Sequence, residues 1–329
     1  MKPITTFSLH FRGVFLLATI VLAGLTSSAR AADELPVLSI SVLQYGTAHW
    51  ELDHIKHHGL DRANGYRLDL QPVANLPASR LAITSGTVNG AVADLLWAQA
   101  RYEADAPYLY VPFSSQIGDI VVASDSAIES VADLPGHRIG VAGGPDSKGW
   151  ILLQEVARKQ GMELAGQVDV QFAAPPLLSQ ALKRGRVDAI VTYWHFAARL
   201  KGEGDAWRSA FAMESLLSEM GLDTNLPVLG YVFPRAWASE NAALVNRFAR
   251  SIDDAKAELA QNPEHWQRLK RLMREPGEGA LQALREGFLA GTPGPMTEQR
   301  IVDLQQLLML TGADEARLMP AALFHREGL

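Results

Sequence analysis

The turn that follows residues 138–142 is the first place where the sequence offers chemistry. Arg-Ile-Gly-Val-Ala predicts a buried strand, and after Gly-Gly-Pro a helix begins, with Asp146 or Ser147 as its N-cap. The first N–H groups of a helix lack partners and lie at the positive end of its dipole, so they can hold an electron-rich group. Lys148 adds a positive charge and Trp150 an apolar wall. The same pattern fits an ordinary helix cap, and this stretch alone leaves both interpretations open.

The other candidate residues follow from a rule for open α/β sheets, whose ligands bind beyond the carboxyl ends of the strands. The candidates for ligand binding at these ends are Tyr45, Thr47, His49, Trp50, Asp94, Trp97, Ser114, Ser115, Gln116, Gly143, Gly144, Asp146, Ser147, Lys148, Trp150, Tyr193, Trp194 and His195. Four of the seven tryptophans are among them. A single tryptophan is more often a core residue, but four together favour a cleft in which rings stack on a ligand. We expect Trp97 and Trp194 to approach each other when that cleft closes.

A group of histidines raises the question of a metal site. They are His49, His54, His57 and His58. His54 and His58 are four residues apart and share a helix face, as zinc ligands often do. The pattern of this helix indicates an exposed surface, however, and Glu51 and Asp53 are the only carboxylates nearby. We therefore interpret these side chains as solvated histidines and expect no metal site.

Catalytic chemistry finds little support in the sequence. The chain lacks the G-x-S-x-G, H-E-x-x-H and G-x-x-x-x-G-K-[ST] motifs. Asp94 and His195 could act as acid and base if two lobes closed, but nothing marks a third partner, so hydrogen bonding to a ligand or backbone is favoured. The chain contains no cysteine, which excludes disulfides, thiolate metal sites, iron–sulfur clusters and a cysteine nucleophile. We expect a binding protein without a cofactor and not an enzyme.

A weak internal repeat indicates how the candidate residues are positioned. Residues 38–60 repeat the order of apolar strand, glycine loop, tryptophan and helix seen after residue 137. Matching residues then recur at a constant offset of 99 positions: Ile40 and Ile139, Pro77 and Pro176, Gly86 and Gly185, Val88 and Val187, Val92 and Val191. This pattern predicts two related βαβαβ lobes whose loops face each other.

The hydrophobic pattern gives the order of elements. Strands are predicted at residues 38–43, 66–73, 89–93, 108–113, 118–123, 138–142, 168–172, 187–193 and 226–234. Helices are predicted at 237–260, 264–273, 279–289 and 297–310, besides those between the strands. We expect residues 36–120 and 230–329 to form lobe one and residues 121–229 to form lobe two. The two crossovers contain Gly118 and Gly230, which we expect to act as a hinge.

The N-terminal residues predict export. Lys2 and Arg12 form a basic region, residues 13–25 are apolar, and Ala29-Arg30-Ala31 is a cleavage signal, so residues 1–31 are interpreted as a secretory signal peptide. No other run is long enough to span a membrane, and no cysteine could carry a lipid. These features favour the periplasm. Without residues 1–31 the net charge is −9, since they hold three of the 30 basic and none of the 36 acidic side chains. Nucleic acid and anionic membranes are poor partners for such a chain.

Two motifs resemble a known family. Residues 130–142 read S-x-A-D-L-P-G-x-R-I-G-V-A, and residues 185–189 read Gly-Arg-Val-Asp-Ala. Together with the doubled lobe, they resemble periplasmic solute-binding proteins of ABC importers, in the branch that binds alkanesulfonates, taurine, nitrate and thiamine-pyrimidine precursors. The resemblance implies the type II periplasmic-binding fold, an α/β fold of two lobes joined by two crossovers with the ligand in the cleft. It also implies a monomer that delivers a small molecule to an ABC permease in the inner membrane.

The ligand is expected to be organic. Lys148 is the one cation among the implied binding loops, beside Asp94 and many rings, so an aromatic or amphiphilic solute with a polar head, of sulfonate or pyrimidine type, fits better than an inorganic anion. A narrower resemblance, to solute-binding proteins near quinoprotein alcohol dehydrogenase genes, implies a chelated metal such as a lanthanide complex. A periplasmic sensor domain is a further alternative. The related pyrimidine synthase needs a cysteine-rich motif that this chain lacks, so it ranks last.

Overall fold

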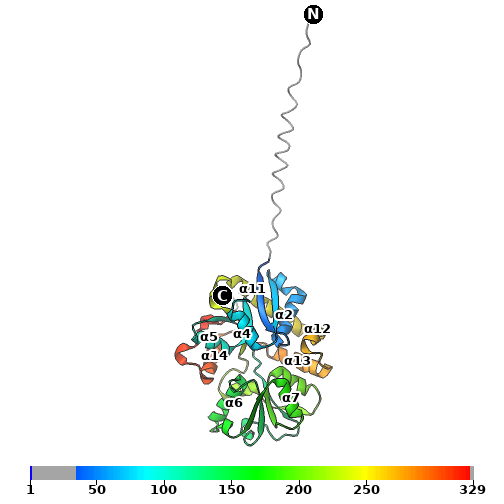
Figure 1. Ribbon diagram of the computed structural model, residues 1–329, viewed down its shortest axis with the longest axis vertical. Helices are drawn as coiled ribbons and strands as arrows, with labels where there is room; N and C mark the ends of the chain where they lie inside the picture. The colour runs from blue at the N-terminus through cyan, green and yellow to red at the C-terminus, as the bar shows by residue number, and fades with distance from the viewer. Residues whose placement is uncertain (2–34, 327–329) are drawn as a thin grey trace. The chain divides into compact units, whose positions relative to one another are not determined.

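The computed structural model describes Met1 and residues 35–326, and Val37–Leu329 form one unit (Figure 1). The predicted signal peptide, apart from Met1, lies outside the described residues. Two five-stranded sheets organise the unit. This is the mixed α/β, two-lobed architecture that the repeat predicted. In the described part of the chain, no helix is long and apolar enough to cross a membrane.

The first sheet has the strand order β2-β1-β3-β10-β4. Its strands are β1 (Val37–Leu43), β2 (Arg67–Val73), β3 (Gly90–Asp94), β4 (Tyr108–Ser114) and β10 (Leu229–Pro234). Strand β1 pairs in parallel with β2 and β3, whereas β10 runs antiparallel between β3 and β4. Parallel strands of this kind are buried on both faces, which explains why β1 reads as a nearly continuous apolar run.

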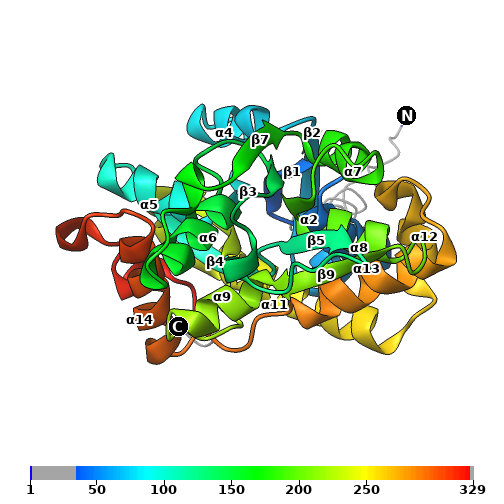
Figure 2. The ribbon, with the colours of Figure 1, turned by 90° about the horizontal axis from the view of Figure 1, so that it is seen from below.

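The second sheet repeats this arrangement in the order β7-β6-β8-β5-β9. Its strands are β5 (Asp119–Ala123), β6 (Arg138–Ala142), β7 (Asp169–Ala173), β8 (Ala189–Thr192) and β9 (Trp207–Ala212). Strand β5 is antiparallel to both β8 and β9, and Figure 2 shows β5 and β9 side by side. The chain crosses between the sheets twice, from β4 to β5 and from β9 to β10. In each sheet, the strand that follows a crossover is the antiparallel fourth strand, β5 in the second sheet and β10 in the first.

Helices connect and cover the sheets. Those of the first lobe, the one built on the first sheet, are α2 (Thr47–His58), α3 (Leu60–Ala63), α4 (Leu76–Thr84), α5 (Leu95–Glu103), α10 (Arg235–Glu240), α11 (Ala242–Gln261), α12 (His265–Leu269), α13 (Glu278–Ala290) and α14 (Glu298–Leu310). Those of the second lobe are α6 (Lys148–Lys159), α7 (Pro175–Lys183), α8 (Trp194–Lys201) and α9 (Met213–Glu219). Short 3-10 turns lie at Val131–Asp133, Leu164–Gly166, Lys270–Met273, Glu315–Arg317 and Ala321–Leu323.

The offset of 99 residues holds between corresponding elements. Helix α4 starts at Leu76 and α7 at Pro175, while β3 starts at Gly90 and β8 at Ala189. Both helices are followed by a left-handed glycine, Gly86 with φ 74° and Gly185 with φ 61°, a conformation that glycine adopts without strain. The glycine identity in the repeat therefore marks a place where backbone geometry restricts the residue type.

The two glycines predicted for the crossovers are closely packed: Gly118 lies in the first crossover, whereas Gly230 is the second residue of β10. A Cβ atom on Gly118, whose φ is 157°, would lie 2.5 Å from the Thr192 carbonyl oxygen. A Cβ atom on Gly230 would lie 2.5 Å from the ring of Tyr110. No larger side chain fits at either position without a shift of its neighbours. Their role as a hinge stays a prediction.

Three elements differ from the prediction. The helix predicted at 264–273 is α-helical only at His265–Leu269 and continues as the 3-10 turn Lys270–Met273. The helix predicted at 237–260 is divided into α10 and α11 at Asn241, whose side-chain amide donates to the Trp237 carbonyl oxygen at 2.9 Å. That local bond competes with the helical pattern. Strand β9 was not predicted because its residues are all half-buried or exposed and show no alternation.

Candidate functional site

Among the described residues, six helices of at least eight residues (α2, α4, α5, α6, α7 and α8) begin at carboxyl ends of strands, and their N-termini differ in how they are capped. The Asp94 carboxylate accepts a 2.8 Å hydrogen bond from the Trp97 N–H and so caps α5. Helices α2, α6 and α8 have no side-chain cap. Ser147 occupies the N-cap position of α6, one of the two residues predicted there, and its buried hydroxyl has no hydrogen-bond partner. Helix α6 therefore presents open donors, as the turn in the sequence predicted.

Charged groups from both lobes meet near these N-termini. Asp94, at the end of β3, lies 3.5 Å from the Arg80 guanidinium of α4. Burial lowers the pKa of the Lys148 ammonium, and the attraction of Asp94 opposes that shift. Burial raises the pKa of the Tyr193 hydroxyl, as do the negative charges of Asp94 and Asp146. Asp94 of the first lobe is thus within electrostatic reach of Lys148 and Tyr193 of the second.

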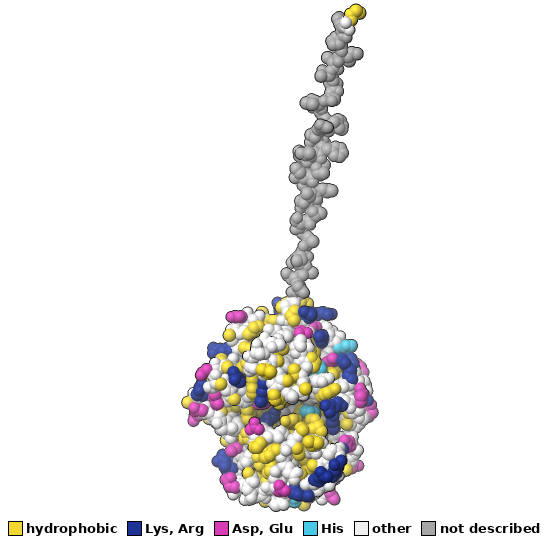
Figure 3. Space-filling view, viewed as in Figure 1, with side chains coloured by type: hydrophobic (Ala, Val, Ile, Leu, Met, Phe, Trp, Pro, Cys, Tyr) yellow, Lys and Arg dark blue, Asp and Glu magenta, His cyan; other side chains and the backbone are white. Residues whose placement is uncertain are grey.

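The turn before α6 lies against Tyr193. Gly143 is left-handed, with φ 93°, and a Cβ atom on it would lie 3.5 Å from the Tyr193 hydroxyl oxygen. Tyr193 is 37% exposed and Lys148 is half-buried, so both are accessible to a solute. Figure 3 shows a furrow where the lobes meet, with basic side chains along it. The structure therefore brings together a subset of the predicted residues, namely Asp94, Gly143, Asp146, Ser147, Lys148 and Tyr193.

The expectation of a four-tryptophan wall is corrected by the structure. Trp50, Trp150 and Trp194 are 0%, 3% and 7% exposed, so they are core side chains. The Trp194 ring meets that of Trp50 edge-on at 5.9 Å and lies against Gly287 of α13. The repeat gives the reason: at the offset of 99, Trp194 corresponds to the buried Leu95, not to Trp97.

Trp97 does not meet Trp194. Its half-buried ring packs against Tyr108 at 5.1 Å, and the Arg80 guanidinium lies 5.9 Å from the ring centre. Trp97 packs against the hydrophobic cluster that contains Tyr108, while Trp194 belongs to the one that contains Trp50. The predicted approach of these two rings across the cleft therefore does not occur in this structure.

Other predicted residues stabilise the loops in which they lie. Thr47 is buried, and the buried His49 ring bonds to the Gln44 carbonyl oxygen at 2.7 Å. Tyr45 is 41% exposed, with the Arg274 guanidinium 4.4 Å from its ring. These contacts hold the start of α2, and among them only the Tyr45 ring has substantial exposure to solvent.

The loop after β4 is bonded to the C-terminal end of α13. The Ser115 N–H donates to the Gly291 carbonyl oxygen at 2.9 Å, and the Gln116 N–H donates to the Ser114 hydroxyl at 3.2 Å. A Cβ atom on Gly291 would lie 2.4 Å from the Gln116 side chain. The predicted serines are 6% and 3% exposed, so this loop packs against α13 more than it faces solvent.

His195 is not paired with Asp94. The described residues include no hydrogen bond between the two side chains, and burial, together with the charge of Arg199, lowers the pKa of His195 to about 3. A histidine with such a pKa stays neutral near pH 7. The acid–base pair considered from the sequence is therefore not formed in this structure.

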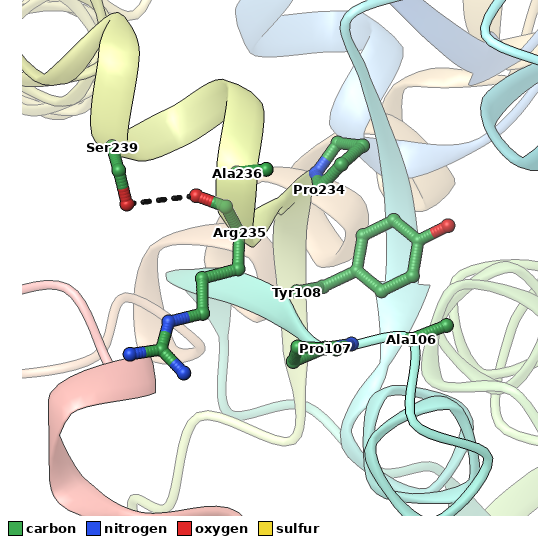
Figure 4. Close-up of a pocket in the computed structure, with 7 residues that line it drawn as sticks. All are labelled: Ala106, Pro107, Tyr108, Pro234, Arg235, Ala236 and Ser239. Carbon is green, nitrogen blue, oxygen red and sulfur yellow. Dashed lines mark hydrogen bonds between the residues drawn. The ribbon is translucent and has the colours of Figure 1, made fainter.

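A cavity of about 400 Å³ lies at the end of β10 that is far from Asp94 (Figure 4). It is lined by Ala106, Pro107, Tyr108, Pro234, Arg235, Ala236 and Ser239. At this end of β10, Pro234 pairs with Tyr108, and at its opposite end Leu229 pairs with Asp94. No predicted site residue lines this cavity, so it is separate from the meeting point of the lobes.

The interpretation of the histidines as solvated surface residues is wrong for the buried His49 and for His54. The His54 side chain is 0% exposed, and its Nε2 lies 2.8 Å from a carboxylate oxygen of Glu258. This contact could not be predicted from sequence spacing because 204 residues separate His54 from Glu258.

Comparisons with known proteins agree with this architecture. The aliphatic sulphonate binding protein SsuA of Escherichia coli has a TM-score of 0.68 at 19% identity, covering 86% of this chain and 97% of that one. SsuA of Xanthomonas axonopodis pv. citri, bound to MOPS, has a TM-score of 0.65 at 22% identity, covering 90% and 100%. The desulfurization enzyme DszB, as a serine-for-cysteine mutant in complex with biphenyl-2-sulfinic acid, has a TM-score of 0.60 at 15% identity, covering 89% of this chain and 97% of that one.

At these identities the solved structures show a shared fold, which includes both periplasmic binding proteins and an enzyme. No curated protein sequence matches the chain. The sequence model of the family described as NMT1/THI5 like matches residues 58–266. Since this match covers more than half of the chain and both lobes, the protein belongs to the NMT1/THI5-like family.

Proposed function

We propose that this protein is a periplasmic solute-binding protein that captures a small organic solute and delivers it to an ABC import permease. One observation carries the proposal: Asp94 of the first lobe lies within electrostatic reach of Lys148 and Tyr193 of the second, next to the uncapped N-terminus of α6. Groups from two lobes that converge on one point can hold a solute between them.

The charge pattern favours a solute with a polar head and an organic body. Lys148 and the open N–H groups of α6 suit a sulfonate or another electron-rich group. Asp94, whose charge is partly offset by Arg80 at 3.5 Å, still presents acceptor oxygens next to them, and this favours a solute group that donates a hydrogen bond over a simple inorganic anion, which only accepts. A ring nitrogen or amino group of a pyrimidine, by contrast, could donate to the Asp94 carboxylate.

Binding without chemical conversion is the activity we expect. The DszB neighbour shows that this fold also occurs in an enzyme, and its mutant replaces a cysteine. The present chain contains no cysteine. Among the described residues, no hydrogen bond joins Asp94 to His195, and neither is paired with another group that could act with it as acid or base.

The test begins with native mass spectrometry of protein purified from the periplasm of its own host, which identifies a retained solute. Calorimetric titration then compares wild type with Lys148→Ala and with Lys159→Ala, a control at the exposed opposite end of α6. A charge-assisted hydrogen bond contributes about 1.5–3 kcal/mol, so Lys148→Ala should weaken binding at least tenfold, while Lys159→Ala should not.

Two outcomes would contradict the proposal. Equal affinities for the two lysine variants would mean that the solute binds elsewhere. Chemical conversion of the solute by the wild-type protein, lost in Asp94→Ala or His195→Ala, would mean that the protein is an enzyme. Small-angle scattering adds a check on mechanism, since a solute that closes the lobes should reduce the radius of gyration.

A further inference from the structure

Three helices of the first lobe converge on a cluster of metal-ligating side chains away from the meeting point of the lobes. His54 and His58 come from the last turns of α2, Glu258 from the end of α11, and His265 from the start of α12. One ligand atom from each of the four lies within 4.8 Å of all the others. Histidine side chains reach the surface on the side of α12 (Figures 1 and 3).

We call His54, His58, Glu258 and His265 the histidine cluster. Its three imidazole rings lie in contact with one another. The ring centres of His54 and His58 are 4.2 Å apart, and that of His265 lies 4.9 Å and 4.5 Å from them. His54 is 0% exposed, and its Nδ1 is buried without a hydrogen-bond partner. An unpartnered buried polar atom is costly. Apart from its contact with Glu258, the His54 ring is therefore unsatisfied among the described residues.

The electrostatic surroundings favour a cation. Helix α2 ends at His58 and α11 ends at Gln261, so the negative ends of two helix dipoles point toward the cluster. Glu258 adds a carboxylate. The nearby Arg268 is paired with Asp53, which offsets its charge.

We propose that His54, His58, Glu258 and His265 bind a divalent transition-metal ion of the Zn²⁺ class. Three imidazoles and one carboxylate are ligands that Zn²⁺ prefers, whereas Ca²⁺ and Mg²⁺ prefer oxygen. Ligand atoms about 2.1 Å from a tetrahedral ion lie about 3.4 Å apart. The largest separation here is 4.8 Å. Rotation of the exposed His58 and the half-buried Glu258 and His265 can close that difference without moving His54.

Such an ion would join parts of the chain that are distant in sequence. It would hold the end of α2 to the α11–α12 corner, at Asn262, Pro263 and Glu264, and would take the place of the direct His54–Glu258 hydrogen bond, because a nitrogen that coordinates an ion cannot also carry the shared proton. Since a ligand that binds only the folded state adds to its stability, the ion should raise the melting temperature. This site is independent of the proposed solute site, and either can fail without the other.

The experiment is calorimetric titration of ZnCl₂ into purified protein that carries no histidine tag and has been dialysed against a chelator. Wild type should bind one Zn²⁺ per chain, and Mg²⁺ should not compete. His58→Ala removes an exposed ligand and so should leave the fold intact; it should weaken binding at least tenfold. His57→Ala is the matched control, because His57 is its exposed neighbour on α2 and is outside the cluster. Its affinity should stay within about threefold of wild type.

A second readout separates coordination from loose surface binding. Co²⁺ in place of Zn²⁺ should give the intense visible absorption of a tetrahedral site in wild type and in His57→Ala, and lose it in His58→Ala and His265→Ala. Absence of Zn²⁺ binding by the wild type would overturn the proposal. Equal losses in His57→Ala and His58→Ala, or octahedral Co²⁺ spectra throughout, would overturn it as well.

Discussion

Replacing Trp194 with alanine should destabilise the protein, and the structure gives the size of the effect. The ring is 7% exposed, meets Trp50 at 5.9 Å, and lies where a Cβ atom on Gly287 would come within 2.6 Å of it. Because so little room surrounds the ring, its removal leaves a cavity, and buried Trp→Ala changes cost about 3–5 kcal/mol. In a domain of this size, each kcal/mol lowers the melting temperature by about 2–4 °C.

The expected fall in melting temperature is therefore on the order of 6–20 °C, measured by differential scanning calorimetry without ligand. Leu177→Ala is the control: this α7 side chain is 64% exposed, and its loss should change stability by less than about 0.5 kcal/mol. A Trp194→Ala protein that melts like wild type but has lost affinity for its solute would refute the reasoning. That result would make Trp194 a ligand-stacking ring, as its position after a strand suggested.

Three further predictions concern stability. Burial and the charge of Arg199 lower the pKa of His195 to about 3 in the folded protein. Its contribution to the free energy of unfolding is therefore complete above about pH 6.5, the pKa of an unfolded histidine, and is lost as the pH falls toward 3. The free energy of urea unfolding should depend less on pH between about pH 7.5 and pH 4.5 in His195→Gln than in wild type. Lys256→Met should lower the free energy of urea unfolding by about 3–5 kcal/mol, because it leaves the fully buried Glu51 carboxylate, 2.7 Å away, without its counter-charge. Adding Glu51→Gln to this variant should restore part of the lost stability. Gly86→Ala should cost about 1 kcal/mol, measured in the same way, because an L-residue is strained at φ 74°.

The repeat in the sequence predicted the fold well because it records backbone constraints. Gly86 and Gly185 end corresponding helices in the left-handed conformation. Pro77 and Pro176 lie in the first turns of α4 and α7, where a missing N–H costs nothing. These constraints are local, so a single sequence displays them.

The site was predicted less well because it depends on contacts between distant residues. Strand ends identified Asp94, Lys148 and Tyr193, but the same rule also selected Trp50 and Trp194, which are buried. A position at a strand end gives the edge of the sheet and not the direction of the side chain. Arg80, which lies beside Asp94, was missed because it is in the middle of a helix with no motif around it.

The histidine cluster, too, depends on contacts between residues that are distant in sequence. Its i, i+4 pair was recognised in the sequence, but a pair of histidines becomes a metal site only with further ligands. Those ligands, Glu258 and His265, lie about 200 residues further along the chain. Nothing in the spacing of α2 could have indicated them.

The two lobes share a fold but offer different chemistry where they meet, and this difference bears on the solute. At the offset of 99, Asp94 corresponds to Tyr193, and both occupy the N-cap position of a helix. The Asp94 carboxylate caps α5, whereas Tyr193 makes no cap bond, and α8 keeps its open N–H groups. The first lobe thus contributes an acceptor and the second lobe donors. A solute that bridges them needs a donor at one end and an acceptor at the other, which is why a polar organic molecule fits this site better than a simple anion.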